Sequence, residues 1–205
     1  DNPANPRWVV KPTVAYLWAR TVNCKACRAE VPLLKTRWLA KKDNKRVVLA
    51  MRPKPDKTGV VFGIDSAAPI KGGNAAQKRE YDKRLGAGTM SRAGVTCPCC
   101  GTIMTMEDIR LGGRAGRVGA VMTAVVVDGP AGKEYRLPTA HEVEMAYKAE
   151  AELEGVFSEV PFGLPTEPIE RYGKPGGSYG FPIVTHGIDQ WHKLFAPRQL
   201  VAMGS

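Results

Sequence analysis

Histidine is scarce in this 205-residue sequence, and long hydrophobic runs are absent. The three histidines, His141, His186 and His192, lie far from the cysteines in sequence. The longest apolar run, residues 120–127, contains Thr123 and is too short to span a bilayer. The first residues have neither the basic nor the apolar region of a signal peptide. We therefore expect no membrane partner and a cytoplasmic location.

Sequence motifs of common enzyme classes are also missing. The sequence has no phosphate-binding loop ending in Gly-Lys-Ser/Thr, no dinucleotide fingerprint, no hydrolase nucleophile elbow and no defensible pair of catalytic carboxylates. We therefore predict no catalytic residue in this chain. Because the chain starts at Asp1 rather than at a methionine, we expect it to be a piece of a longer protein.

Cysteine is sparse but clustered, with five residues that are too few for a disulfide framework. Four of them form two C-x-x-C pairs, a spacing that lets a tight turn place two thiolates on one ion. Gly101, which follows the second pair, suits the positive φ of such a turn. Two such turns give the tetrahedral site of a zinc ribbon. We predict one structural zinc ion bound by Cys24, Cys27, Cys97 and Cys100.

Cys99 leaves the ligand assignment open to alternatives. It could form a C-x-C pair with Cys97 or an adjacent pair with Cys100, and five thiols without metal are a further alternative. The C-x-x-C spacing favours Cys97 and Cys100 and leaves Cys99 free. The 69 residues between the two pairs exceed the roughly 15–20 of simple fingers, so we expect an enlarged insertion closed by the ion. An independent enzyme with a catalytic zinc is a further alternative, and such an ion would keep an open position and usually a histidine ligand.

Positive charge is concentrated in the cysteine-containing part of the chain. The formal net charge is +10 at pH 7. Residues 1–118 hold 23 Lys and Arg against 9 Asp and Glu, whereas residues 119–205 hold 7 against 11. Such segregation favours contact with a polyanion, nucleic acid first, although a solvated basic surface has the same composition.

Two groups of basic residues are candidates for phosphate contact. The first group lies at the tip of the first expected hairpin and consists of Lys41, Lys42, Lys45 and Arg46. The second is Arg114 and Arg117 in the glycine-rich run 112–117, whose backbone N–H groups could approach a phosphate. A solvated hairpin tip and a plain flexible linker are the respective alternatives.

Hydrophobic alternation and turn residues predict an α+β fold with a zinc-ribbon-like antiparallel β meander, an enlarged insertion, a β hairpin and a few helices. The expected strands are residues 13–22, 31–39, 46–51 and 59–64 in the meander, and 120–127 and 134–137 in the hairpin. The expected helices are residues 74–85 with Asn74 as cap, 105–111, 139–154 with a stop at Gly155, 188–195, and 197–203 starting at Pro197. We divide the chain into a basic zinc-ribbon β region, residues 1–138, with a mobile insert at about 66–94, and a helical, Pro/Gly-rich region, residues 139–205.

Several separate stretches together resemble one known family. They are residues 14–22 leading into Cys24-x-x-Cys27, residues 30–33, residues 38–42, Gly88-Thr89, Cys97-x-x-Cys100-Gly101, residues 113–119, Tyr179-Gly180 and residues 194–200. In this order and spacing they resemble the large bacterial and archaeal adenine-specific DNA methylases, long catalogued as a family of unknown function. Some members of that family sit among anti-phage and modification systems.

The resemblance implies a module rather than a complete enzyme. The family's S-adenosylmethionine motif (D-P-F-x-G-G-G) and its D-P-P-Y motif are absent, so only the four cysteines carry over, as the family's metal-binding positions. The chain then looks like the central zinc-bearing insertion of a DNA adenine methyltransferase, with S-adenosylmethionine bound by the parent enzyme alone. The implied partners are DNA, the catalytic methylase domains and other defence-system proteins. The implied role is DNA binding or target positioning, and the alternative is a purely structural or partner-docking module.

Overall fold

A computed structural model describes residues 11–42, 44–169 and 182–205 of the chain. Within these residues it contains three antiparallel sheets and four α-helices, so the predicted α+β class is confirmed. No helix in this described part combines the length and the apolar character that crossing a bilayer requires. Asp43, at the tip of the first expected hairpin, and the Tyr179-Gly180 motif lie outside the described residues.

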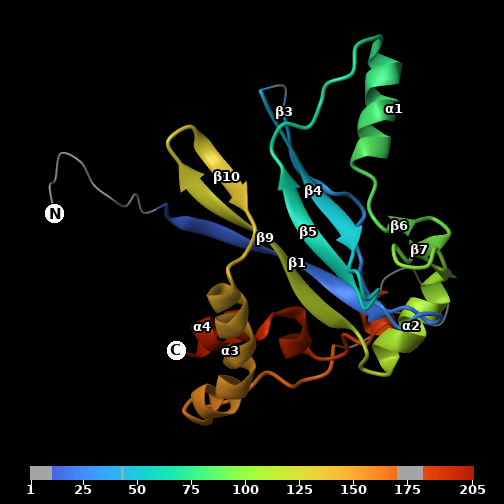
Figure 1. Cartoon of the computed structure of the whole chain (residues 1–205). Helices are drawn as coiled ribbons and strands as arrows, with labels where there is room; N and C mark the ends of the chain where they lie inside the picture. Colours follow the sequence, from blue (N-terminus) through green and yellow to red (C-terminus); the bar gives the residue numbers. More distant parts are fainter. Residues whose placement is uncertain (1–10, 43, 170–181) are drawn as a thin grey trace, which may run out of the picture.

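The largest sheet has the strand order β10-β9-β1-β2 and joins the two halves of the sequence (Figure 1). Its strands are β1 (Thr13–Asn23), β2 (Glu30–Pro32), β9 (Gly119–Gly129) and β10 (Gly132–Arg136). The sequence predicts strand 13–22 in a meander with the strands that follow it. Strand β1 does pair with β2, but only over residues 21–23, and its long pairing is with β9, in a register from Thr13↔Val127 to Thr21↔Gly119. Residues 122–127 of β9 are all buried, and a strand buried in this way belongs in the interior of a sheet.

The predicted meander exists in a smaller form, as β3 (Trp38–Lys42), β4 (Lys45–Pro53) and β5 (Val60–Asp65). The prediction of one strand over residues 31–39 is wrong, because the chain leaves the first sheet at Pro32 and enters the second at Trp38. Between them, the Leu34 N–H donates to Thr89 Oγ1 (3.0 Å), and the Leu34 carbonyl accepts from the Met90 N–H (2.9 Å). Hydrophobic alternation cannot reveal such a crossing between two sheets.

The expected insert at residues 66–94 contains a helix and part of the third sheet. Helix α1 (Ala75–Leu85) begins at the predicted cap Asn74, whose side chain accepts from the Gln77 N–H at 2.9 Å, and it ends at Gly86. The third sheet consists of β6 (Met90–Ser91), β7 (Gly94–Thr96) and β8 (Ile103–Met104). Helix α1 has no buried residue and stands beside the β3–β4 hairpin (Figure 1). The mobility of residues 66–94 stays a prediction.

Helix α2 (Met106–Arg114) is longer than predicted and corrects the interpretation of the glycine-arginine run. It is capped by Thr105 and continues through Gly112 and Gly113, where the sequence leaves a phosphate-contacting loop and a flexible linker as the two alternatives. Gly113 packs so closely on η1 (Pro182–His186) that a Cβ there would lie 2.1 Å from the His186 carbonyl oxygen. Glycine is needed here for the close approach of two backbones.

Helix α3 (Ala140–Ser158) begins at the predicted capping box, but the predicted stop at Gly155 is wrong. A Cβ on Gly155 would meet nothing within 4 Å, so this glycine neither packs closely nor ends the helix. On the sheet side, Ala146 of α3 joins Met122, Val125 and Val127 of β9 in one hydrophobic cluster. The sheet face and the helix therefore share one core across the sequence boundary at residue 138, although the division into two domains stays a prediction.

Two shorter elements complete the chain. η2 (Trp191–Leu194) is a single 3₁₀ turn within the predicted helix 188–195, and α4 (Pro197–Gly204) begins with Pro197 as predicted. Helices α3 and α4 lie close together beside the β1–β9 pair (Figure 1). This arrangement places residues 191–204 next to a strand that starts at Thr13.

The capping box of α3 includes a bidentate ion pair that makes stability depend on pH. Arg136 donates to both carboxylate oxygens of Glu142 at 2.7 Å, and the Thr139 N–H donates to the same carboxylate at 2.8 Å. The hydrogen bonds from Arg136 are the main cause that lowers the pKa of Glu142 from 4.5 to about 2. Because the folded pKa is depressed, the stabilisation is complete above about pH 4.5 and is lost as the pH falls towards 2.

We expect Glu142→Gln to lower the free energy of unfolding by about 1–2 kcal/mol at pH 7. The difference from the unmodified chain should vanish between pH 4.5 and pH 2, because the native carboxylate is then protonated as well. Urea unfolding at several pH values measures this difference. Glu144→Gln is the matched control, since Glu144 lies on the same helix in an exposed pair with Lys148. A pH-independent effect of Glu142→Gln would contradict the assignment.

Candidate metal centre

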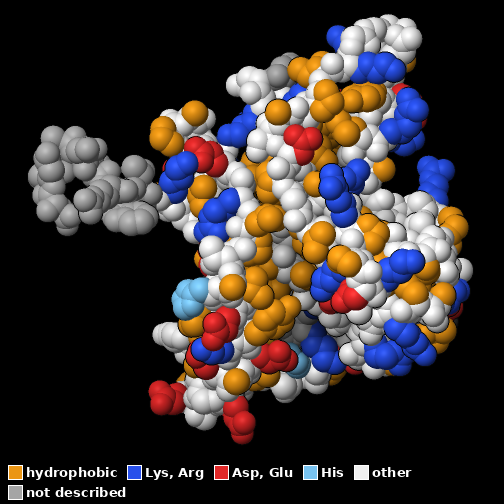
Figure 2. Space-filling view, viewed as in Figure 1, with side chains coloured by type: hydrophobic (Ala, Val, Ile, Leu, Met, Phe, Trp, Pro, Cys, Tyr) orange, Lys and Arg blue, Asp and Glu red, His pale blue; other side chains and the backbone are white. Residues whose placement is uncertain are grey.

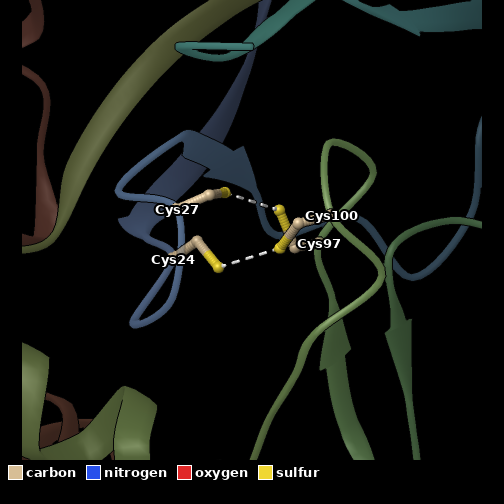
Figure 3. Close-up of side chains that lie close together, drawn as sticks. All are labelled: Cys24, Cys27, Cys97 and Cys100. Carbon is tan, nitrogen blue, oxygen red and sulfur yellow. Dashed lines mark hydrogen bonds between the residues drawn. The ribbon is translucent and has the colours of Figure 1, made fainter.

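The four cysteines of the two C-x-x-C pairs point toward one another (Figure 3). Their Sγ atoms all lie within 4.8 Å, with 3.7 Å between Cys24 and Cys100 and 3.7 Å between Cys27 and Cys97. A tetrahedral zinc ion with Zn–S bonds of about 2.3 Å places its sulfurs about 3.8 Å apart. A disulfide would need sulfurs about 2.05 Å apart. The four sulfurs are therefore spaced so that they could hold one zinc ion.

Both pairs are built on the same backbone turn. The N–H of the first cysteine donates to the carbonyl five residues later, from Cys24 to Ala29 at 2.8 Å and from Cys97 to Thr102 at 2.9 Å. The first turn connects β1 to β2, and the second connects β7 to β8. Two equivalent turns that face each other from distant parts of the chain match the geometry of a four-thiolate structural site.

The residue after each pair has a positive φ, +63° at Arg28 and +76° at Gly101. The N–H of each donates to the carbonyl of the first cysteine of its pair, at 3.0 Å and 2.9 Å. The sequence predicts this conformation for Gly101, and the structure confirms it. The sequence does not predict a positive φ at Arg28, because a residue with a side chain disfavours the left-handed region by about 1 kcal/mol.

We expect Arg28→Gly to raise the free energy of unfolding by about 0.5 kcal/mol, because it relieves this strain. Gly101→Ala should lower it by about 1 kcal/mol, since a Cβ there meets no neighbour within 4 Å and only the backbone conformation is affected. Urea unfolding of the metal-loaded chain measures both. Arg28→Ala is the control: if it stabilised as much as Arg28→Gly, the side chain rather than φ would be responsible.

Burial and hydrogen bonding shift the pKa values of two of the clustered thiols in opposite directions. Burial raises the pKa of the Cys97 thiol to about 12, although the N–H groups of Cys99 and Cys100 donate to its sulfur. The side-chain hydrogen bond between Cys100 Sγ and Thr102 Oγ1, followed by the bond from the Thr102 N–H, lowers the pKa of Cys100 to about 6. Metal binding requires thiolates and releases their protons. A divalent cation would compensate the negative charge that burial otherwise opposes at Cys97.

The site is the centre of a small hydrophobic core. Cys24 and Cys97 are buried in a cluster that also contains Val31, Val95 and Ile109, while Cys27 and Cys100 reach the surface. The segments that meet here are β1, β2, β7, β8 and α2. Because the core is small and its segments are far apart in sequence, a bound ion would supply much of its stability.

An ion pair fastens the first cysteine turn to helix α2. The Nζ of Lys25, which lies between Cys24 and Cys27, is 2.7 Å from Asp108 Oδ2. The hydrogen bond from Lys25 is the largest cause that holds the pKa of Asp108 below its usual range, ahead of the bond from the Thr105 N–H. The same carboxylate therefore caps α2 and contacts the first cysteine turn.

Cys99 lies outside the four-sulfur cluster. Its Sγ is half-buried and 3.3 Å from the carbonyl oxygen of Gly59, immediately before β5. The group of possible metal ligands found in the described residues contains Cys97 and Cys100 and omits Cys99. The geometry thus favours the C-x-x-C assignment over the C-x-C and adjacent alternatives.

At the hairpin tip, two of the predicted phosphate ligands are held by Asp82 of α1. Arg46 donates to the Asp82 carboxylate and lies over the Trp38 ring, with its guanidinium carbon 4.7 Å from the ring centroid. Lys41 Nζ is 3.1 Å from the same carboxylate, and Trp38 Nε1 donates to the Asp82 carbonyl at 3.0 Å. The hydrogen bond from Arg46 is the main cause of a lowered pKa at Asp82. Only 10% of the Arg46 side chain is exposed, so its main role in this structure is to fasten α1.

The other candidates lie in different surroundings. Lys42 is exposed and makes no ion pair within the described residues, while Lys45 donates to the Lys133 carbonyl on β10. Arg114 pairs with Glu107 at 2.7 Å on α2, and Arg117 is exposed after the helix. The hairpin and α2 lie at different ends of the structure (Figure 1). The six residues therefore do not form one surface.

Sequence reasoning missed Asp82 and the role of Trp38. Asp82 is one of two acidic residues in a basic helix, where it resembles an ordinary solvent-exposed charge. Its partners come from β3 and β4, 36 to 44 positions earlier in the chain. No local pattern joins them, so only the three-dimensional structure shows the anchor.

A comparison of the chain with family models, curated proteins and solved structures found no match. The resemblance to adenine-specific DNA methylases therefore stays a prediction.

Proposed function

We propose that this chain is a zinc-ribbon-like module in which a structural zinc ion organises a basic surface for DNA. The observation that carries the proposal is the cluster of Cys24, Cys27, Cys97 and Cys100. Four thiolates would fill every position of a tetrahedral ion and leave none for a substrate or an activated water. Such a closed site stabilises a fold, which agrees with its position inside a hydrophobic core.

The DNA-binding surface of this proposal is the β3–β4 hairpin tip together with α1, which we call the basic arm. The two elements are fastened to each other through Asp82. The exposed cations of the basic arm are Lys41, Lys42, Lys78, Arg79, Lys83 and Arg84. Figure 2 shows many Lys and Arg side chains over the upper and right parts of the molecule, with a few acidic side chains among them, and a group of acidic side chains at the lower left. A field of one sign on a projecting element suits contact with phosphates.

The parent protein in this proposal is a DNA adenine methyltransferase. The support is the resemblance of the separated sequence stretches, of which the two cysteine pairs form the best-defined part. The catalytic domains would bind S-adenosylmethionine and methylate the base, and this chain would hold the DNA or position its target. Finding D-P-F-x-G-G-G before and D-P-P-Y after this region in the full-length gene would support that parent, and their absence would contradict it.

A salt titration of DNA binding tests the role of the basic arm. We expect Lys42→Gln combined with Lys83→Gln to weaken duplex binding about 10-fold at low salt, to a similar extent for unrelated sequences. The slope of log affinity against log salt should fall by about 2, since each phosphate contact contributes about 0.9. Fluorescence anisotropy of a labelled duplex measures both quantities.

Lys148→Gln is the control for this titration. Lys148 is an exposed lysine of α3, paired with Glu144 and outside the basic arm. Its replacement should leave the salt slope unchanged. An unchanged affinity of the basic-arm variant, or an equal loss in the control, would contradict the proposed surface.

A second candidate is a structural or partner-docking module. The observation that favours it is the exposure of large apolar side chains on α3 and α4, with Met145 at 45%, Tyr147 at 54% and Met203 at 58%. A gel shift of the metal-loaded chain with duplex DNA separates the two candidates. A shift at low salt supports the DNA module, and the absence of any shift favours docking.

A further inference from the structure

A cleft of about 750 Å³ lies between the large sheet and the C-terminal elements, and none of the cysteines lines it. Its floor comes from β1 and β9, one wall from α3, and the other wall from the segment that joins η2 to α4. This volume is in the range of small-molecule sites. Neither the zinc site nor the basic arm uses it.

Aromatic side chains line the cleft from three directions. Trp18 of β1 is half-buried in its floor, Tyr147 stands on α3, and Phe195 follows η2. Tyr147 is 54% exposed and Phe195 39% exposed, so ring surface remains open to a ligand. Aromatic faces presented in a cleft stack well on planar heterocycles, with a stabilisation that is largely independent of which base is bound.

Two arginines line the same cleft and are held in place by the protein. The Arg198 guanidinium lies over the Tyr16 ring, 4.2 Å from the centroid. Arg20 donates through Nη2 to the Lys193 carbonyl at 3.1 Å. A guanidinium has five N–H donors, so each arginine retains donors for an anion such as a phosphate.

Two carboxylates also line the cleft and restrict what can bind there. Glu30 accepts from the Thr21 hydroxyl at 2.8 Å, and Glu150 is exposed on α3. A purely anionic ligand would be repelled by them. A ligand that combines a phosphate with an amino-bearing ring suits both the arginines and the carboxylates. Its phosphate can accept from the arginines, and exocyclic amino groups such as those of adenine and cytosine donate to carboxylates.

We propose that this cleft binds a single unstacked nucleotide, with the base between Tyr147 and Phe195 and the phosphate at Arg20 and Arg198. The inference rests on the proposed role in nucleic-acid binding and extends it from duplex contact to an unpaired base. The ligand chemistry, a planar amino-bearing ring plus a phosphate, is shared by a nucleotide within a single strand and by a free mononucleotide.

The test uses the metal-loaded chain and three probes: labelled oligo(dA), labelled duplex DNA and adenosine monophosphate. We expect Tyr147→Ala combined with Phe195→Ala to weaken oligo(dA) binding about 10-fold and Arg198→Gln to weaken it several-fold, with duplex affinity unchanged. Oligo(dT) should bind more weakly than oligo(dA), because thymine lacks the amino group. Displacement of oligo(dA) by the monophosphate assigns the cleft to free nucleotides as well, and its failure assigns the cleft to the strand.

Phe162→Ala and Lys148→Gln are the controls, since Phe162 is 94% exposed and neither residue lines the cleft. If the cleft variants bound oligo(dA) and the monophosphate like the unmodified chain, the inference would be overturned. Failure of the proposed function gives a different pattern, in which the basic-arm variant keeps its duplex affinity while the cleft variants still lose the single strand.

Discussion

Removal of zinc by a chelator is expected to unfold the core around the cysteines while most of the β1–β9 pair persists. The free energy of zinc binding to a structural four-ligand site is about 10–16 kcal/mol, as large as the whole stability of an ordinary domain. The core at risk is small and joins Cys24 to segments about 70 residues later in the chain. Hydrogen exchange measured before and after chelation should show lost protection in β2, β7, β8 and α2.

Substitution of single cysteines tests whether zinc binding by the four assigned ligands stabilises this core. Cys97→Ser should abolish stoichiometric zinc binding and produce the chelated state without a chelator. Cys99→Ser is the matched control, because its sulfur faces the Gly59 carbonyl rather than the cluster, and it should retain one zinc per chain. Metal analysis and circular dichroism measure both. Loss of zinc in Cys99→Ser to the same extent as in Cys97→Ser would contradict the ligand assignment.

Replacement of Asp82 is expected to have the second largest effect. Asp82→Ala leaves the Arg46 guanidinium, only 10% exposed, without its carboxylate partner. Removing one partner of a mostly buried ion pair costs about 3–5 kcal/mol. Helix α1 has 11 residues and none of them is buried, and a helix of that length is marginal without tertiary contacts. We therefore expect α1 to lose hydrogen-exchange protection as well as the chain to lose stability.

Glu80→Ala provides the control for Asp82→Ala. Glu80 lies on the same helix in an exposed i,i+4 pair with Arg84 at 3.9 Å, which is worth little in water. Its loss should change the free energy of unfolding by less than about 0.5 kcal/mol. Equal effects of the two substitutions would mean that the Asp82 contacts do not anchor α1. The zinc content should be unchanged in both variants.

The predictions that succeed depend on neighbouring residues. Asn74 and Thr139 each carry the local signature of a helix cap, and both helices begin there. The C-x-x-C spacing likewise encodes a turn within five residues, and the two turns form as that spacing indicates. Pro197 at the start of α4 belongs to the same class. In each case the residues that decide the structure are adjacent in sequence.

The predictions that fail depend on contacts between distant residues. The pairing of β1 with β9 joins residues about 100 positions apart, and nothing within residues 13–22 specifies that partner. Gly113 reads as a flexible loop residue but is needed because the backbone of His186 passes beside it. The anchoring of Arg46 by Asp82 has the same origin. Charge and spacing in the sequence therefore indicate candidate residues, whereas only the three-dimensional structure shows which distant residues contact them.

The separation of the two cysteine turns has a consequence for synthesis of the protein. Sixty-nine residues lie between Cys27 and Cys97, and a ribosome adds about 5–20 residues per second. Cys24 and Cys27 therefore emerge several seconds before their partners, with two ligands and no complete site. During that interval the first thiols are open to oxidation or to capture by another metal. Loading of zinc would have to follow emergence of Cys100, so translation speed and thiol protection together would set the yield of correctly assembled protein.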